Sequence, residues 1–346
     1  NFRLLNKIPP EKTEILDKIK KFSCAKRPVS KKDFLSLISG CVEVLESEVT
    51  DYRKPVSISD EVPGGLVDFT GKKGFDVIVV PDLHARKELI YKLLSYGIDE
   101  KTGESVFERL CSGKLLIIFL GDILHSESDK KERWLKAYDE YSAGNALSEQ
   151  MTEEMTDGLA TLCQVMILKK AFPEIVHCLK GNHENIKNEN SGGNFAFRKF
   201  VDEGSMVYDF MSEKYGDKIV NAIYKFELLL PVMASFDDFL ISHAEPLKSY
   251  SKEEVIDSVI KSEVVYGLTW TRNGDVKTET AGTMFDSICK KNKIEKKYIT
   301  GHRPVKGKFN LRQNGDVVQI HNPHVMQFAY IKNGDGFNPE NDIYEL

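Results

Sequence analysis

Residues 180–184 read Lys-Gly-Asn-His-Glu and come directly after the apolar run 174–179, Glu-Ile-Val-His-Cys-Leu. The run has the length and composition of a buried β-strand. Gly181 permits a sharp exit from that strand, because glycine adopts backbone angles that other residues avoid. An amide, an imidazole and a carboxylate follow in three consecutive positions. An ordinary loop could also have this sequence. Whether residues 180–184 belong to a functional site therefore depends on the rest of the chain.

The same design, an apolar strand that ends in metal-ligand side chains, occurs four more times. The strands are predicted at residues 75–80, 115–120, 239–242 and 297–300, and the side chains that follow them are Asp82 and His84, Asp122 and His125, His243 and Glu245, and His302. Five of the eight histidines therefore lie just past predicted strand ends. Carboxylates and imidazoles gathered at one edge of a sheet bind divalent cations, so the pattern predicts a metal site there.

The composition narrows the class of protein. The chain has 346 residues, of which 41% are hydrophobic, enough for a sizeable core in one large domain or two small ones. Its net charge of -5 argues against a general nucleic-acid binder, which needs clustered positive charge. No apolar run reaches the ~20 residues of a membrane span. The six cysteines form no Cys-x-x-Cys pair, which fits a reducing compartment. We expect a cytoplasmic protein, with a signal or anchor removed before Asn1 as the alternative.

The chain divides into two predicted parts. Residues 1–74 are predicted to form a helical N-terminal extension with two helices, the second capped by Ser30. Residues 75–346 are predicted to form the domain that carries the metal site, with a helical insertion at about 126–172. The polar part of this insertion, residues 126–155, is a candidate lid or protein-partner surface, and the N-terminal extension is a second candidate partner surface. An insertion without such a role is the alternative.

The order of elements predicts a mixed fold. From residue 75 onward strands alternate with helical segments, the clearest of which are 86–96, 156–170 and 195–230. This alternation alone would favour a doubly wound parallel sheet, but the hairpin turns Asn314-Gly315 and Asn333-Gly334 argue for antiparallel pairs near the end of the chain. Ligands that arrive from five strand ends fit a central mixed β-sandwich flanked by helices. We therefore predict a fold of the α/β (α+β) class.

The ordered motifs of residues 75–330 resemble those of the calcineurin-like metallophosphoesterases. In chain order these motifs are Asp82-x-His84, Gly121-Asp122, Gly181-Asn182-His183-Glu184, His243 and Gly301-His302. The match is closer to the phosphoprotein phosphatase (serine/threonine phosphatase-like) branch of bacterial and phage type, because of three further stretches: Leu230-Pro231-Val232-Met233-Ala234, Trp270-Thr271-Arg272 and Gly301-His302-Arg303-Pro304-Val305. The resemblance implies a metallophosphoesterase-like four-layer architecture.

The resemblance also implies a site for two divalent metal ions, with manganese expected and iron or zinc as alternatives. Asp122 would bridge the two ions, and Asp82 and His84 would complete the protein ligands of the first. The second ion would be held by Asn182, His243 and His302.

The reaction that the resemblance implies is in-line attack of a metal-bridging hydroxide on phosphorus, without a covalent enzyme intermediate. His183 would act as general acid and protonate the leaving oxygen. Arg272, together with Arg303 or Arg86, would hold the phosphate oxygens, to which a guanidinium group is well suited. A phosphorylated protein or small molecule is thus the expected substrate.

Several positions depart from the family pattern, among them Pro81 and Ala85 in the first motif, and three of the departures bear on catalysis. His125 stands where the family has the aspartate that orients the general-acid histidine, and it is our candidate for that catalytic position. Ser126 stands where the family has a phosphate-binding arginine, and Glu245 replaces a glycine. A carboxylate at Glu245 would repel a phosphate dianion unless a cation offsets it. His321 and His324 are interpreted as structural or surface histidines, and also as candidates to support the ligands because they lie near the last motif.

Three functions remain open. The first is a metal-dependent phosphatase that hydrolyses phosphate monoesters, with phosphoserine or phosphothreonine in proteins as candidate substrates. The second is a phosphodiesterase or nucleoside polyphosphate hydrolase on the same site, which would tolerate Glu245 and the missing arginine better because its phosphate carries less charge. The third is a metal-binding regulatory module with weak turnover, in which the N-terminal extension and the 126–155 insertion are partner surfaces.

Overall fold

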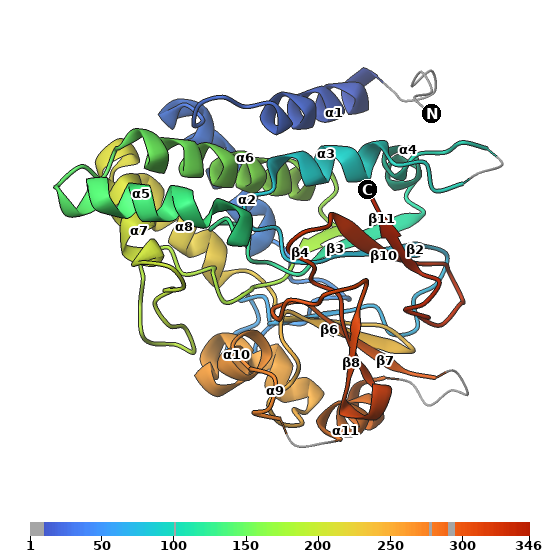
Figure 1. The fold of residues 1–346 in the computed structure, drawn as a ribbon. Coiled ribbons are helices and arrows are strands. Elements are labelled where there is room, and N and C mark those ends of the chain that lie inside the picture. Colours follow the sequence, from blue (N-terminus) through green and yellow to red (C-terminus); the bar gives the residue numbers. More distant parts are fainter. Residues whose placement is uncertain (1–9, 100–101, 277–278, 290–294) are drawn as a thin grey trace.

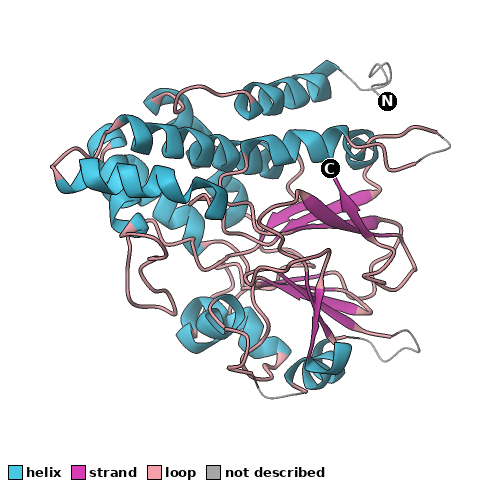
Figure 2. Cartoon of the chain, in the orientation of Figure 1, coloured by secondary structure: helices cyan, strands magenta, loops and turns pink. Residues whose placement is uncertain are grey.

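The computed structural model describes residues 10–99, 102–276, 279–289 and 295–346. Within these residues the strands form two mixed sheets, with helices on both outer sides (Figure 1). One sheet has five strands in the order β11-β10-β2-β3-β4, and the other has six in the order β1-β5-β6-β7-β9-β8. Figure 2 shows the two sheets between the layers of helix. The predicted β-sandwich flanked by helices is therefore confirmed.

The elements follow one another along the chain in a largely alternating order. The strands are β1 (Leu66–Asp68), β2 (Asp76–Val80), β3 (Leu115–Phe119), β4 (Val176–Cys178), β5 (Met233–Ser235), β6 (Phe239–Ser242), β7 (Lys297–Thr300), β8 (Asn310–Arg312), β9 (Val317–Gln319), β10 (Gln327–Ile331) and β11 (Ile343–Glu345). The α-helices are α1 (Pro10–Ser23), α2 (Lys31–Glu46), α3 (Lys87–Ser95), α4 (Val106–Cys111), α5 (Lys131–Ser142), α6 (Glu149–Ala171), α7 (Glu203–Tyr215), α8 (Asp217–Leu228), α9 (Lys252–Ile256), α10 (Ser262–Thr269) and α11 (Thr280–Ile288). Among the described residues, no helix combines the length and the apolar character needed to cross a membrane.

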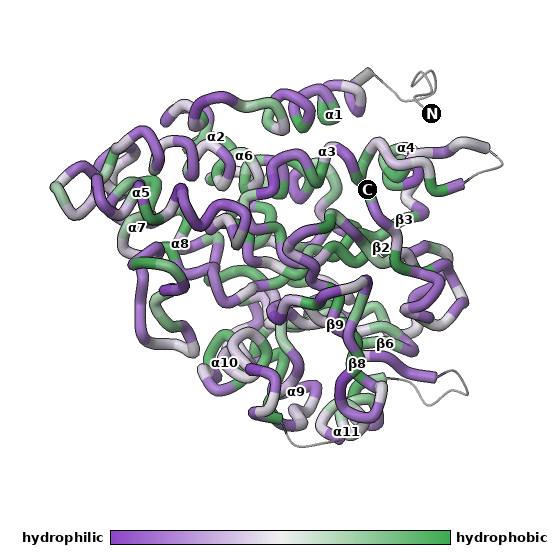
Figure 3. The backbone as a smooth tube through the Cα atoms, viewed as in Figure 1, coloured by the Kyte–Doolittle hydropathy of each residue, from purple (hydrophilic) through white to green (hydrophobic). Residues whose placement is uncertain are grey.

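Strand side chains divide between separate cores, as the two-residue period of a strand requires. Val77 and Val79 of β2 pack in the core between the two sheets. Ile78 and Val80 of the same strand pack in the core beneath α1 to α8. On the far side of the molecule, Leu240 of β6 packs with residues of α9, α10 and α11. Figure 3 shows the hydrophobic residues, in green, along strands such as β2 and β3. The result is four layers: helix, sheet, sheet and helix.

Most of the predicted elements are confirmed. The five strands predicted to precede ligand residues are β2, β3, β4, β6 and β7. Ser30 caps α2 as predicted, because its side chain accepts a hydrogen bond from the backbone N–H of Asp33. The continuous helix predicted at 195–230 is wrong. Gly216, at a φ of 79°, separates α7 from α8, and residues 194–202 contain no helix.

The two predicted hairpins are both antiparallel pairs, but they differ in their connections. β8 and β9 are joined by the short turn that contains Asn314-Gly315. β10 and β11 also pair, yet residues 332–342 connect them, so the Asn333-Gly334 turn only begins a longer loop. A tight turn motif therefore predicted the strand pairing but not the length of the second connection.

A buried ionic cluster joins the N-terminal segment to the rest of the protein. Glu48, just after α2, accepts hydrogen bonds from the side chains of Arg53 and of Lys169 on α6. All three side chains are buried. In the same segment, residues of α1 and α2 share a core with α3, α6 and α8, and β1 pairs with β5. The domain boundary after residue 74 stays a prediction, but the segment before it packs closely against the rest of the chain.

We expect Glu48→Gln to lower the free energy of unfolding by about 3–5 kcal/mol, because Arg53 and Lys169 would remain buried without their counter-charge. Denaturant unfolding followed by circular dichroism would measure the change. Glu46→Gln is the matched control, because the ion pair of Glu46 with Lys225 is about half exposed and should contribute within about 1 kcal/mol. Equal effects of the two substitutions would contradict a stabilising role for the buried cluster.

Candidate metal centre

Loops from both sheets meet at one end of the sandwich. β2, β3 and β4 are parallel neighbours, as are β6 and β7, so the loops that follow the strands of each set lie at a common edge. These loops hold the predicted ligand and catalytic residues: Asp82 and His84 after β2, Asp122 and His125 after β3, Asn182 and His183 after β4, His243 after β6, and His302 after β7. All of these side chains are buried except that of His302, which is half-buried.

Three groups of ligand atoms in the described residues lie close enough together to hold metal ions. Within each group all the atoms are within 4.8 Å of one another, and the groups are Asp82, His84 and His321; His84, Asp122 and His183; and Asp122, His243 and His302. Asp122 belongs to two of them. Its Oδ2 lies 3.7 Å from His84 Nε2 and 3.3 Å from His243 Nε2. The carboxylate of Asp122 therefore lies between the ligands predicted for the first ion and those predicted for the second.

Asn182 lies beside the group formed by Asp122, His243 and His302. Its Oδ1 lies 2.9 Å from His243 Nε2 and 2.9 Å from His302 Nδ1. On the other side of the centre, His84 Nε2 lies 3.7 Å from Asp82 Oδ2. The structure thus brings all six predicted metal ligands together. Asp82 and His84 contact one another, Asn182 contacts His243 and His302, and Asp122 contacts both sets.

Backbone carbonyl groups orient two of the imidazole rings. His84 Nδ1 lies 3.0 Å from the carbonyl oxygen of His125, and His243 Nδ1 lies 2.9 Å from that of Leu120. In each ring an N–H at Nδ1 would donate to the carbonyl and leave Nε2 unprotonated toward the centre. Hydrogen bonds of this kind commonly fix the tautomer of metal-binding histidines.

The charges of the centre favour bound cations. Burial opposes protonation of His84, yet Glu127, Asp82 and Asp122 raise the pKa of its imidazole to about 9. Burial also opposes protonation of His243, and Asp122 with Asp82 nevertheless raises its pKa to about 9. The buried carboxylates thus attract protons to the histidines that surround them. Divalent ions would supply the same positive charge, so the donor set fits a metal centre.

The backbone of the centre is strained at several non-glycine residues. His84, Asp122, His125 and His302 have φ angles of 42°, 49°, 64° and 59°. Residues with a Cβ rarely adopt positive φ, and such strain persists where the surrounding structure imposes it, often at functional sites. These residues are therefore held in position by their neighbours and not by local preference.

Gly301 makes room for the carboxylate of Asp82. A Cβ at position 301 would lie 1.8 Å from Asp82 Oδ1. Asp82 cannot easily withdraw, because its Oδ2 accepts a hydrogen bond of 2.9 Å from the backbone N–H of His302. The glycine of this motif is therefore required by the close approach of two loops.

We expect Gly301→Ala to displace Asp82, to reduce metal binding and to destabilise the fold by about 1–3 kcal/mol through overpacking. Gly307→Ala is the control, because a Cβ there would have no atom of the described residues within 4 Å apart from those of its chain neighbours. For both variants, the bound metal would be counted, and the midpoint of thermal unfolding would be measured in the presence of a chelator. A Gly301→Ala protein with unchanged metal content would show that Asp82 can move without loss of the site.

Aromatic rings surround His183. Its ring centroid lies 3.6 Å from that of Phe197, 4.9 Å from that of His84 and 5.0 Å from that of His125. His183 Nε2 lies 3.6 Å from Asp122 Oδ2. Burial, foremost, holds the pKa of His183 well below its ordinary value, and burial lowers that of His125 to about 3. Burial therefore favours the neutral form of both rings.

The three predicted phosphate-binding arginines lie in different surroundings. Arg86 donates to four backbone carbonyl groups, those of Leu83, Asn322, Val325 and Asp82. These bonds use most of the five N–H groups of the guanidinium, which favours a structural role for Arg86. Arg303 follows His302 and is half-buried, whereas Arg272 follows α10 and is exposed. Arg272 and Arg303 therefore have more freedom to contact a substrate than Arg86.

Arg133 of α5 lies beside Ser126, the position where the family has an arginine. Its Nη2 donates to Ser126 Oγ at 3.2 Å, and the guanidinium also pairs with Glu154 and with Asp157. A cleft of about 640 Å³ opens beside the metal centre, and His84, Ser126 and Arg133 contribute to its lining. Sequence reasoning missed Arg133, because only the packing of α5 on α6 brings it to this cleft.

A cation offsets the charge of Glu245, which the sequence placed near the substrate. Arg312 donates to Glu245 Oε1 at 3.1 Å, and Gln313 Nε2 lies 3.3 Å from Oε2. The side chain of Glu245 is fully buried. The carboxylate is thus paired within the protein, which reduces the repulsion expected from an unpaired charge.

Three further residues of the centre were not among the predicted ligands or catalytic groups. Glu184 accepts hydrogen bonds from the backbone N–H groups of Gly181, Asp122 and Ile123, and so ties the loop after β4 to the loop after β3. Glu127 lies 3.5 Å from His84 Nε2. His321, kept only as a supporting candidate, lies in one of the three ligand groups. Its position just past β9 repeats the strand-end pattern and is the signal that could have found it.

The fold is similar to that of solved phosphatases. It resembles a protein serine/threonine phosphatase from Saccharomyces cerevisiae with a TM-score of 0.56 and 14% identity, over 92% of this chain and 89% of that chain. A cold-active protein-tyrosine phosphatase from a psychrophilic Shewanella has a TM-score of 0.41 and 13% identity, over 81% of this chain and 82% of that chain. No protein-family model and no curated protein matches the sequence. At 14% identity the yeast structure shows a shared fold alone, and it indicates no particular branch.

Proposed function

We propose that this protein is a metal-dependent phosphatase that hydrolyses phosphate monoesters. The observation that carries the proposal is the position of Asp122, whose carboxylate lies between His84 and His243 and belongs to two groups of ligand atoms. Two groups that share a carboxylate suit a pair of divalent ions ~3.5–4 Å apart, an arrangement that recurs in phosphoester hydrolysis.

The proposed metal ligands follow from these groups. Asp122 would be a ligand of both ions, and Asp82 and His84 would be the other protein ligands of the first ion. Asn182, His243 and His302 would be the other protein ligands of the second ion. Manganese is the proposed metal, with iron or zinc as alternatives, because mixed oxygen and imidazole donors suit these ions better than calcium. Bound ions would supply an activated water molecule and would neutralise charge on the phosphate.

His183 would donate a proton from Nε2 to the leaving oxygen. A general acid must carry that proton, and burial opposes it. Asp122, 3.6 Å from Nε2, favours protonation, and a bound phosphate would add negative charge in the same direction. Phe197 covers the ring and keeps water from the transferred proton. His183 is thus placed to become protonated when substrate binds.

The substrate would be held by cations at the mouth of the centre. Arg303 and Arg272 would contact phosphate oxygens, and the cleft lined by Arg133 would accept the group that the phosphate is attached to. Phosphoserine and phosphothreonine in proteins are the proposed substrates. The support for this choice is the fold shared with a protein serine/threonine phosphatase.

A phosphodiesterase is the second candidate, and Glu127 is the observation that favours it. This carboxylate lies 3.5 Å from His84 Nε2 and adds negative charge beside the proposed first ion. Repulsion would be stronger for a phosphate monoester dianion than for a diester monoanion. Glu127 is nevertheless paired with Lys199 at 2.7 Å, which offsets part of its charge.

A paired assay tests the proposal. Initial rates would be compared on p-nitrophenyl phosphate and bis-p-nitrophenyl phosphate with manganese-loaded protein, and then on phosphoserine and phosphothreonine peptides. We expect faster turnover of the monoester, loss of activity with chelator and recovery with manganese. Faster turnover of the diester would favour the second candidate, and full activity in chelator would contradict a metal-dependent reaction.

A further inference from the structure

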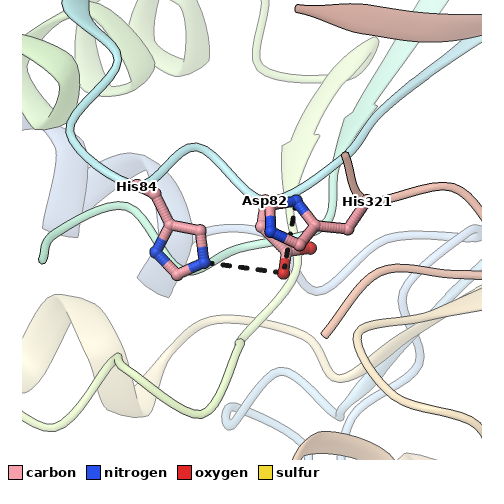
Figure 4. A group of neighbouring side chains, drawn as sticks. All are labelled: Asp82, His84 and His321. Carbon is pink, nitrogen blue, oxygen red and sulfur yellow. Dashed lines mark ion pairs between the residues drawn. The ribbon is translucent and has the colours of Figure 1, made fainter. Parts of the chain in front are cut away.

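His321 lies in the proposed metal centre although it belongs to none of the family motifs. It follows β9 closely and is fully buried. Its Nδ1 lies 3.8 Å from Asp82 Oδ2, and its ring centroid lies 5.1 Å from that of His84. Figure 4 shows the two imidazoles approaching the Asp82 carboxylate from separate loops. An ion bound by Asp82 and His84 would therefore lie within reach of a third side chain.

The two ring nitrogens of His321 have different surroundings. Nε2 lies 2.8 Å from Glu127 Oε2, a good hydrogen-bond distance, so an N–H at Nε2 would donate to this carboxylate. Nδ1 is buried and has no hydrogen-bond partner in the described residues. A separation of 3.8 Å from Asp82 is too long for a hydrogen bond. The tautomer set by Glu127 thus leaves an unprotonated, unpartnered nitrogen directed at the ligand group.

An unsatisfied buried nitrogen is unfavourable unless something binds it. A metal ion would bind it, and a carboxylate that accepts from the other nitrogen is the usual partner of a metal-binding histidine. Here that carboxylate is Glu127, which is itself held by Lys199 Nζ at 2.7 Å from its other oxygen. Lys199, Glu127 and His321 therefore form a chain of contacts that ends at the metal centre.

The loop that carries His321 is fixed to the loop that carries Asp82. Arg86 donates to the carbonyl oxygen of Asp82 and also to that of Asn322, the residue after His321. The carbonyl oxygen of His321 accepts a hydrogen bond of 2.8 Å from the backbone N–H of Val305. Arg86 therefore ties the loop that carries His321 to the loop that carries Asp82.

We propose that His321 is an additional ligand of the first metal ion, through Nδ1, and that Glu127 is its positioning residue. The inference rests on the proposed metal-dependent function. Asp122 would be shared by both ions, and each ion would then have two imidazole ligands, His84 and His321 for the first. A second imidazole favours later divalent metals of the first transition series over magnesium or calcium at that position. His321 would therefore raise the affinity of the first position for transition-metal ions, iron and zinc above all, and its selectivity against magnesium and calcium.

Metal binding by His321→Ala tests the inference without an activity assay. The protein would be loaded with manganese or zinc, the bound metal counted by mass spectrometry, and the two affinities measured by competition with a chromophoric chelator. We expect one of two ions to be lost or to bind at least about 10–100-fold more weakly, since losing only the partner of a ligating histidine already costs that much; the other ion should be unchanged. Glu127→Gln, which keeps the imidazole, should weaken the same ion by a smaller factor. His324→Ala, an exposed histidine of the same loop, is the matched control.

The outcomes separate this inference from the proposed function. If the wild-type protein binds two ions and His321→Ala binds them with unchanged affinities, His321 is not a ligand although the proposed function stands. If the wild-type protein binds no metal, both fail. His321→Phe keeps the ring volume and removes both nitrogens, so it replaces His321→Ala if that variant does not fold. A metal-induced rise in thermal midpoint that is smaller in either His321 variant than in His324→Ala would support the inference.

Discussion

Asp122→Asn should lower turnover of p-nitrophenyl phosphate by roughly 10³-fold or more, which corresponds to a loss of about 4 kcal/mol of transition-state stabilisation. The substitution keeps the shape of the side chain and its Oδ1, which accepts a hydrogen bond of 2.9 Å from the backbone N–H of His183. It removes the negative charge that lies between His84 and His243. Asparagine would also turn an amide N–H₂ or a neutral oxygen toward two cations. We therefore expect both activity and bound metal to fall while the fold is retained.

Metal counting and chelator-dependent melting would accompany this assay. Asp139→Asn is the matched control, because Asp139 is exposed on α5 and outside the three ligand groups. The metal-induced rise in thermal midpoint should disappear in Asp122→Asn and persist in Asp139→Asn. Full occupancy of two ions in Asp122→Asn would show that Asp122 is not shared, and the proposal for the centre would lose its main support.

The strand ends were predictable because short apolar runs are strong local signals. The runs before Asp82, Asp122, Asn182, His243 and His302 each became a strand, so the spacing of the motifs was enough to place these residues at one edge. The mixed sandwich followed from the same pattern with the antiparallel pairs at the end of the chain. The local sequence pattern therefore predicted correctly the five strands that position the metal centre.

The partners of these residues were not predictable, because they depend on contacts far apart in the chain. Glu127 and His321 are 194 positions apart, and only the packing of the two sheets brings them together. Phe197 was expected in a helix, but it lies in a loop that covers His183 and His125. Arg86 resembled a phosphate ligand by its place after a motif, whereas its hydrogen bonds tie two loops together. A motif identifies the atoms for the chemistry, and the fold decides what surrounds them.

His183→Ala should produce a loss of turnover that depends on the leaving group. General acid catalysis contributes roughly 10²–10⁴-fold when the leaving oxygen is strongly basic. The alkoxide of serine is such a group, so a phosphoserine peptide should lose activity by about this factor. p-Nitrophenolate is a far weaker base and leaves without full protonation, so p-nitrophenyl phosphate should lose much less. If the fold-loss on the phosphoserine peptide is much larger than the fold-loss on p-nitrophenyl phosphate, the substitution has removed a proton donor.

Metal content decides between two roles for His183, because it also lies in a ligand group with His84 and Asp122. A general acid can be removed without loss of metal, so His183→Ala should retain two ions, as should the exposed-histidine control His324→Ala. A variant that lost an ion and turned over both substrates equally slowly would assign His183 to metal binding instead. Its close contact with Phe197 argues for the first role, because the aromatic ring keeps bulk water away from the proton that passes to the leaving oxygen.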